Sequence, residues 1–190
     1  MATTLNDHRE RLVGGMVAAV VERGYAATTI TDVVRHARVS RRTFYEHFAD
    51  KESCFLAAYD AVSDAVLEGI AGAAGEEASL QERIVASVRA YLRALAEEPA
   101  VARVFVVEIL GAGPAALARR RAVLRRFAAL IQAQVAEAGG SVPPLSDAAS
   151  LALVGAIHEL VLEALEEDRG DALPALERDV AAVVHAVLVR

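Results

Sequence analysis

The sequence predicts an all-α fold, in which a small head of three helices is followed by a larger helical body. Apolar residues recur three and four positions apart along almost the whole chain, and this spacing places them on one face of a helix. Ser, Thr or Asp stands before several of these segments as an expected N-cap, and Gly or Pro marks where others begin or end. A single cysteine, Cys54, excludes an internal disulfide and a zinc site built from cysteines. We expect Cys54 to be a buried small apolar residue.

Charge is divided unevenly along the chain. The net charge is −6, yet residues 1–51 hold seven Arg and the only Lys against six acidic residues. The remaining residues hold 12 basic and 20 acidic side chains. A basic head on an acidic body orients the head toward phosphates. We therefore divide the chain into a basic head, residues 1–50, and an acidic body, residues 51–190.

The first helix is predicted over about residues 7–23, where apolar residues form a stripe. Gly14 and Gly15 weaken a helix, so we expect close packing against a neighbour at this point. Gly24 is the expected C-cap.

Two short helices joined by a tight turn come next. Thr29 is the expected N-cap of the first, with Asp32 three residues later in the place of a capping-box acid. Ser40 caps the second, which buries Phe44 and Phe48 one turn apart. The other side chains of this helix point outward: Arg41, Arg42, Thr43 and Tyr45. Two guanidiniums, a hydroxyl and a phenol on an exposed helix face suit the major groove of DNA, so this segment is predicted to be a helix-turn-helix.

At these residues the chain resembles the TetR family of transcriptional regulators. The family pattern has Gly-Tyr after the first helix, Thr-Thr before the second, an Ala-Gly-Val-Ser turn, a Tyr-x-His-Phe ending and a Lys-Glu start to the fourth helix. Here the matching residues are Gly24-Tyr25, Thr28-Thr29, Ala37-Arg38-Val39-Ser40, Tyr45-Glu46-His47-Phe48 and Lys51-Glu52. Arg38 departs from the pattern because the family usually has glycine there. A left-handed conformation costs a non-glycine residue about 1–2 kcal/mol, so we expect a strained or altered turn.

The body is predicted to be helical throughout. A helix starts at Lys51 and ends at the Gly-rich break at 71–75, and the helical spacing of the following segments indicates these further helices: about 80–97, 100–110, 114–138, 146–168 and a last one to the C-terminus. Residues 100–110 are rich in β-branched types, which also occur in strands, but their apolar spacing favours a helix. The five arginines between 119 and 126 indicate a solvated helix face, with binding of a polyanion as the alternative.

The last two helices carry wide apolar surfaces. In the segment from 146 to 168 two apolar stripes run side by side, and the last segment adds another. Such surfaces suit a four-helix bundle made with a second copy of the chain, and the resemblance implies the same homodimer interface. The alternative is that both stripes close the core of the monomer.

Together these observations predict a homodimeric repressor that binds a near-palindromic operator in double-stranded DNA and is released by a small molecule. Arg41 and Arg42 are the candidates for reading base edges, and Thr43 for a base or a thymine methyl group. Arg38 adds a cation beside the DNA. The phosphate contacts expected from the motif are Thr29, Tyr45, His47 and Lys51. Lys51 stands at the N-terminus of a helix, where the helix dipole makes a positive charge unfavourable. A phosphate docked at the same helix end would make this charge favourable.

The regulatory half of this prediction depends on the resemblance, which implies a pocket enclosed by the body helices for a small lipophilic effector. The candidate lining residues are Tyr59, Tyr91, Phe105, Glu108, Phe127 and His158. His158 is also compatible with a purely structural role, and for Glu108 the two interpretations weigh equally.

Two other classes of function were weighed. One is a DNA-binding protein of the same fold that has no ligand switch. An enzyme is disfavoured because the chain lacks a Glu-x-x-His pair, a phosphate loop and a nucleophile placed beside a base. His47 as a metal ligand or catalytic base is disfavoured because its only carboxylate at helical spacing, Asp50, is the expected N-cap of the helix that starts at Lys51. No metal and no cofactor are therefore expected. The first ten residues lack a signal-peptide pattern and no run of 18 apolar residues occurs, so the expected location is cytoplasmic, without a membrane partner.

Overall fold

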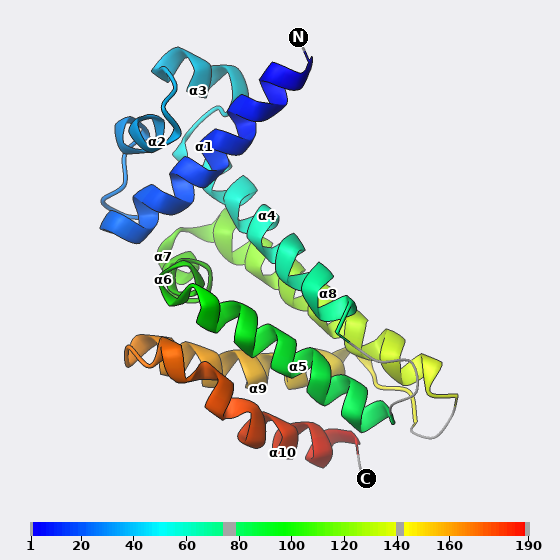
Figure 1. Cartoon of the computed structure of the whole chain (residues 1–190). Coiled ribbons are helices and arrows are strands. Elements are labelled where there is room, and N and C mark those ends of the chain that lie inside the picture. The colour runs from blue at the N-terminus through cyan, green and yellow to red at the C-terminus, as the bar shows by residue number, and fades with distance from the viewer. Residues whose placement is uncertain (1, 74–78, 140–142, 189–190) are drawn as a thin grey trace.

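The computed structural model describes residues 2–73, 79–139 and 143–188. These residues form helices and no strand, which confirms the all-α prediction. The head consists of three helices, α1 (Ala2–Arg23), α2 (Ile30–Ala37) and α3 (Arg41–His47). From the head, α4 (Lys51–Ala71) runs down into the body, where it packs against α5 and α8 (Figure 1).

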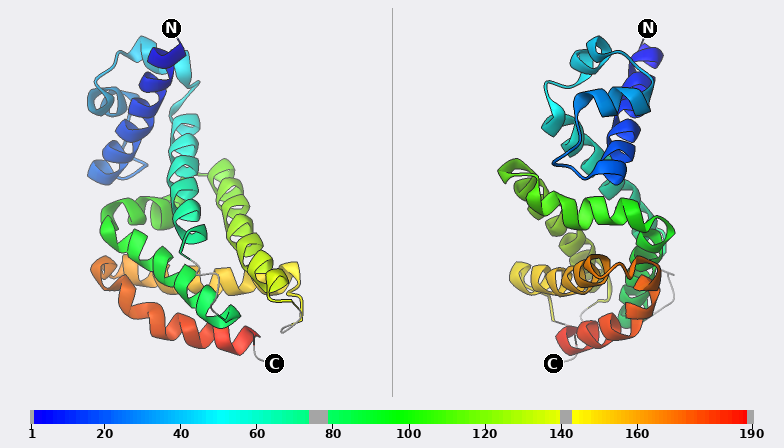
Figure 2. Two further views of the ribbon diagram at one scale, coloured as in Figure 1. Left: turned by 45° about the vertical axis from the view of Figure 1, so that its right-hand side comes forward. Right: turned by 90° about the vertical axis from the view of Figure 1, so that its left-hand side faces the viewer.

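The body is built from crossing helices, with α5 between α4 and α8 on one side and α10 on the other (Figure 2). Its elements are α5 (Leu80–Glu97), α6 (Pro99–Arg103), η1 (Val104–Glu108), α7 (Ile109–Gly111), α8 (Pro114–Glu137), α9 (Asp147–Glu166), η2 (Gly170–Leu176) and α10 (Glu177–Leu188). Residues 100–110 are helical as predicted, but η1 is a π-helix turn. A single wide turn leaves the apolar spacing nearly intact, so the sequence pattern does not reveal it.

The predicted caps set the helix starts in the head. Thr29 and Asp32 form a complete capping box: the Asp32 N–H donates to Thr29 Oγ1, and the Thr29 N–H donates to Asp32 Oδ2 at 3.0 Å. Ser40 Oγ accepts from the Thr43 N–H at 3.0 Å and starts α3. Asp50 caps α4, where its carboxylate accepts from the Ser53 N–H at 2.7 Å.

In the described residues two large apolar cores hold the fold together, with a smaller apolar cluster between α8 and α9. The first joins α1, α2, α3 and the upper half of α4, and it continues into η1 through Tyr59 and Phe105. The second lies among α5, α9, η2 and α10. Cys54 is fully buried in the first core, and this burial raises the pKa of its thiol to about 12. The prediction of a buried cysteine is therefore confirmed.

Helix α9 is the most apolar element of the body. By length and composition it is able to cross a membrane, with a mean hydropathy of 1.6, a property that the count of uninterrupted apolar residues had missed. A core helix has the same composition, and α9 packs against α8, α10, η1 and η2. Within the window, 44% of the residues are buried.

The two adjacent glycines of α1 have different surroundings. A Cβ atom on Gly15 would lie 2.7 Å from the Val33 carbonyl oxygen and 2.8 Å from the Ala37 nitrogen, whereas one on Gly14 would meet nothing within 4 Å. Gly15 is therefore where α1 and α2 approach each other closely. The close packing against a neighbour that was expected to offset the weak helix propensity of glycine is present at Gly15 and absent at Gly14.

We predict opposite effects of alanine at these two positions. Gly15→Ala forces the backbones of α1 and α2 apart and is expected to lower the free energy of unfolding by about 1–3 kcal/mol. Gly14→Ala only removes the entropy cost of glycine in a helix and is expected to raise it by about 0.5–1 kcal/mol. Urea unfolding followed by circular dichroism measures both, and a stabilising Gly15→Ala would contradict the close approach.

Candidate DNA-binding surface and effector pocket

Helix α3 presents two arginines on the outside of the head. Phe44 is fully buried and anchors the helix, and Phe48, its C-cap, is buried beside it. The Arg42 side chain is 90% exposed and its Nε donates to Glu46 Oε1 at 3.1 Å. Arg41 is exposed as well, and donates to the Thr31 hydroxyl at 3.3 Å. Buried aromatic residues thus hold a helix whose guanidiniums face solvent, as the sequence predicted.

The other predicted base and groove contacts lie on the same helix or beside it. Tyr45 is 53% exposed, with its ring edge-on to Phe44. Thr43 is half-buried, and its hydroxyl is 2.9 Å from that of Ser40, so part of its hydrogen-bonding capacity is used in the cap.

The turn between α2 and α3 has the left-handed residue that the sequence predicted. Arg38 has φ 53° and ψ 45°, in the position where glycine costs least. An arginine from α1 supports this turn, because Arg11 donates to the carbonyl oxygens of Ala37 at 2.7 Å and Arg38 at 2.8 Å. These two hydrogen bonds therefore stabilise the left-handed turn. The Arg38 side chain itself is exposed.

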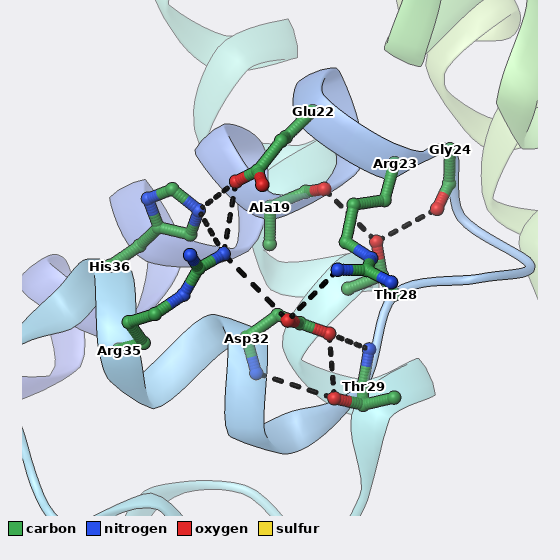
Figure 3. A network of polar contacts seen from close by, with 9 residues as sticks. All are labelled: Ala19, Glu22, Arg23, Gly24, Thr28, Thr29, Asp32, Arg35 and His36. Carbon is green, nitrogen blue, oxygen red and sulfur yellow. Dashed lines mark hydrogen bonds and ion pairs between the residues drawn. The ribbon is translucent and has the colours of Figure 1, made fainter.

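A polar network fixes α2 against the end of α1 (Figure 3). The Thr28 hydroxyl donates to Gly24 O at 2.8 Å and to Ala19 O at 3.1 Å. Glu22 accepts from Arg35 at 3.0 Å and lies 2.8 Å from His36 Nε2. The hydrogen bond with His36, and then the charge of Arg35, hold the pKa of Glu22 below its ordinary value.

Asp32 closes the same network. It lies 3.7 Å from both Arg23 and Arg35, and the Thr29 hydroxyl donates to it at 2.6 Å. Hydrogen bonds from Thr29 are the main cause that lowers the pKa of Asp32. The proton of the Thr29 hydroxyl is thus already used, and its contact with a phosphate stays a prediction.

Tyr25 joins the head to the body through its main chain and ring. Its N–H donates to Glu108 Oε2 of η1 at 2.9 Å, and its carbonyl oxygen accepts from Lys51 Nζ at 2.9 Å. The same ammonium donates to Thr28 O at 3.0 Å and lies 4.3 Å from the centre of the Tyr25 ring, which packs on Phe55. Loop, connecting helix and body therefore meet at one residue.

This junction changes the interpretation of two predicted residues. Glu108 was expected in the effector pocket, but the structure places it at the junction, where its carboxylate binds the loop after α1. Lys51 uses two of its three N–H groups inside the protein, so its phosphate contact stays a prediction. His47 Nε2 is buried without a hydrogen-bond partner among the described residues, and its phosphate contact also remains untested.

A pocket of about 60 Å³ opens between α4, α5, α8 and α9. Three of the six residues predicted for the effector site line it, namely Tyr91, Phe127 and His158. The rest of the wall is almost entirely apolar, and comprises Ile70, Ile84, Ser87, Val88, Leu124, Leu130, Ile131, Gln134, Val154 and Ile157.

Tyr59 and Phe105 do not line this pocket. Their ring centres are 5.7 Å apart and both are buried in the core that continues from the head. A helical pattern shows that these residues face inward, but not which of two neighbouring cores they enter. They lie outside the present pocket, and their contact with an effector stays a prediction.

The polar groups of the pocket are few, with Ser87 and His158 buried and Tyr91 and Gln134 half-buried. The Tyr91 hydroxyl lies 3.4 Å from His158 Nδ1, and the side-chain amide of Gln134 donates to Ser87 Oγ at 2.8 Å. Burial, and then the positive charge of Arg120, lower the pKa of His158 to about 4, so the imidazole is neutral at pH 7. In the described part of the chain no group of His, Cys, Asp and Glu is arranged to hold a metal ion.

Comparisons with known proteins agree with this architecture. The family model described as "Bacterial regulatory proteins, tetR family" matches residues 17–58. The uncharacterized HTH-type transcriptional regulator YerO of Bacillus subtilis is 33% identical over 54 residues, which are 28% of this chain and 19% of that protein. The chain thus matches this curated relative over about a fifth of the relative's length.

Solved structures share the whole fold. The fatty acid degradation regulator FadR of Bacillus halodurans superposes with a TM-score of 0.81 at 19% identity, covering 93% of this chain and 94% of FadR. FadR of Bacillus subtilis, in complex with stearoyl-CoA, gives 0.80 at 17% identity, covering 95% and 97%. A bacterial regulatory protein of the tetR family from Rhodococcus RHA1 gives 0.67 at 24% identity, covering 95% and 96%.

Residues 17–58 thus carry a helix-turn-helix similar to that of the tetR family of bacterial regulatory proteins, and the whole chain shares the fold of the solved regulators.

We predict that Glu108→Ala loosens the head from the body. The Tyr25 N–H loses its charged acceptor, which is expected to lower the free energy of unfolding by about 1–3 kcal/mol and to speed amide hydrogen exchange at Tyr25. Exchange measured by NMR on the whole chain reports this directly. Glu108→Gln keeps a side-chain oxygen and serves as the matched control, and unchanged exchange in Glu108→Ala would show that the bond does not form in solution.

Proposed function

We propose that the protein is a ligand-responsive transcriptional repressor that binds a near-palindromic operator as a homodimer. One observation carries this proposal: α4 connects the two sites. Its first residue, Lys51, is part of the junction beneath the recognition helix, and Ile70, near its end, lines the apolar pocket.

In this proposal α3 enters the major groove of double-stranded DNA. Arg41 and Arg42 read base edges, where a bidentate arginine contributes about 1–3 kcal/mol of discrimination. Thr43 contacts a base or a thymine methyl group. The residues that hold the backbone are Thr29, Arg38, Tyr45, His47 and Lys51. A two-fold dimer places the two recognition helices about 34–36 Å apart, so the half-sites repeat about one helical turn apart.

The dimer is proposed to form through α9 and α10. Most residues of the two apolar stripes predicted on α9 are buried within the monomer, as the alternative interpretation had it. The outer face of α9 still carries small residues, with Ala152 and Ala156 exposed, and Ala182 and Ala186 are exposed on α10. Such small side chains allow close helix packing with a second copy.

The effector is proposed to be a lipophilic small molecule held in the pocket. Its apolar wall supports this, as does the likeness in fold to a FadR that binds stearoyl-CoA. Ligand pockets usually measure about 300–1,000 Å³, so a ligand must widen the present space of about 60 Å³. Widening moves Ile70 and with it α4, and so changes the spacing of the two heads at a coupling of about 1–3 kcal/mol.

The small size of the pocket also favours a second candidate, a DNA-binding protein of the same fold without a ligand switch. A fluorescence-anisotropy titration on the protein's own promoter, with and without a panel of lipophilic compounds, separates the two. Release by at least one compound supports the switch, and binding that persists across the panel supports the unswitched form.

We predict that Arg42→Ala relaxes sequence choice. Affinity for the operator is expected to fall by about 1–3 kcal/mol, since a base contact is lost, while affinity for random DNA changes little. Fluorescence anisotropy at one salt concentration measures both. Arg121→Ala removes an exposed arginine from the body and is the control. Equal losses on operator and random DNA would contradict base reading by Arg42.

We predict that Ala156→Arg separates the dimer. The side chain is exposed in the single chain, so the substitution leaves the monomer folded but places a charge in the proposed interface. Sedimentation velocity is expected to show a monomer with weakened operator binding. Ala65→Arg, at an exposed position of α4, is expected to stay dimeric. A dimer that survives Ala156→Arg would place the interface elsewhere.

A further inference from the structure

His158 is a buried polar group whose hydrogen bonding is incomplete. It lines the apolar pocket and is 8% exposed, and its Nε2 has no hydrogen-bond partner among the described residues. A buried polar atom without a partner costs free energy, so natural proteins rarely keep one without a reason. The neighbouring Tyr91 hydroxyl reaches only the other ring nitrogen, Nδ1.

The proton on this ring can be placed by counting partners. If the Tyr91 hydroxyl donates to Nδ1, both of these atoms are satisfied and only an N–H at Nε2 remains unpaired. If instead Nδ1–H donates to Tyr91, the hydroxyl proton and the Nε2 lone pair both lack partners. The first arrangement leaves fewer unpaired groups, so Nε2 carries the proton and acts as a donor toward the pocket.

The electrostatic surroundings favour an acceptor in the ligand. Arg120, on α8, is half-buried with its Nε unpartnered in the described structure, and its positive charge acts on Tyr91 and His158. Among the residues that the structure describes, no Asp or Glu lines the pocket, and Glu108 lies at the junction. Gln134 Oε1 also lacks a partner there, but a neutral amide oxygen does not offset the cost of burying an ammonium group.

We propose that His158 Nε2–H is the polar anchor of the effector, and that the effector is an apolar chain or ring ending in a carbonyl or carboxylate oxygen. This inference rests on the proposed ligand pocket. It names the polarity of the ligand, because the pocket offers a donor beside a positive charge and rejects a cation. The oxygen accepts from Nε2–H, and the apolar part displaces the walls formed by Phe127 and Leu124.

The test uses three probes with the same chain: octanoate, methyl octanoate and octylammonium. Isothermal titration calorimetry on the whole protein, without DNA, is expected to show both oxygen-bearing probes binding at least about tenfold more tightly than octylammonium. The ratio of octanoate to methyl octanoate then tells a carboxylate from a neutral carbonyl. Absence of binding by both oxygen-bearing probes, or tighter binding of octylammonium, overturns the proposal.

Substitutions locate the effect on the proposed atom. His158→Phe keeps an aromatic ring without the donor and is expected to weaken octanoate and methyl octanoate about tenfold, leaving octylammonium unchanged. His158→Gln restores an N–H donor and is expected to recover part of the loss. Phe127→Leu changes only the apolar wall and is expected to weaken all three probes alike. Thermal unfolding shows whether each variant is folded, and equal loss of all three probes in a folded His158→Phe overturns the anchor.

A second readout does not depend on which probe binds. The ¹⁵N shifts of the histidine rings, with His158 assigned by His158→Gln, are expected to show the proton on Nε2, and a proton on Nδ1 overturns the proposal. Operator release is measured separately. Probes that bind through His158 but leave the operator bound support the anchor and refute the switch, whereas release by octylammonium that is unaffected by His158→Phe supports the switch and refutes the anchor.

Discussion

The hydrogen bond between the Tyr25 N–H and Glu108 fixes where the head sits on the body. On the other side of the same residue, Lys51 holds the Tyr25 carbonyl and covers its ring. The position of the recognition helix depends on this arrangement, because α2 is tied to the end of α1 and α3 packs on both. A carboxylate acceptor makes the bond stronger than one between neutral groups. Gly24, with φ 74°, lets the chain turn just before Tyr25, in a backbone conformation that other residues rarely adopt.

The π-helix turn η1 places Glu108 at this junction and also contacts both cores. Phe105 packs on Tyr59 of α4 in the core that continues from the head, while Val106 belongs to the core of the body. Wide π turns are rare and often occur at functional sites. Within the five residues of η1, Phe105 joins the first core, Val106 joins the second and Glu108 binds the loop after α1. In the proposed switch, a displacement of α4 at the pocket would reach the junction by two routes, along α4 itself and through the contact of Tyr59 with Phe105 of η1.

The sequence predicted local features well because their causes are local. The caps at Thr29, Ser40 and Asp50 and the left-handed Arg38 follow from nearby residues alone, and the structure has them all. The exposed arginines of α3 follow from helical spacing. Glu108, Tyr59 and Phe105 lie outside the present pocket, which the sequence did not reveal because spacing shows that a residue faces inward but not which core it joins. The internal bonds of Lys51 were hidden for the same reason, since their partners lie more than 20 residues away.

The proposed switch requires that α4 move without unfolding the body, and the contacts between α4 and α8 are compatible with such a movement. Beside the apolar packing, α4 is held to α8 by ion pairs of Asp60 with Arg119 and of Asp64 with Arg126, in which every side chain is between 34% and 50% exposed. Exposed pairs of this kind contribute about 0–1 kcal/mol each. Both can re-form in water after a small shift of the helix. The cost of displacing α4 thus falls mainly on the apolar contacts around the pocket, which a lipophilic ligand replaces with its own.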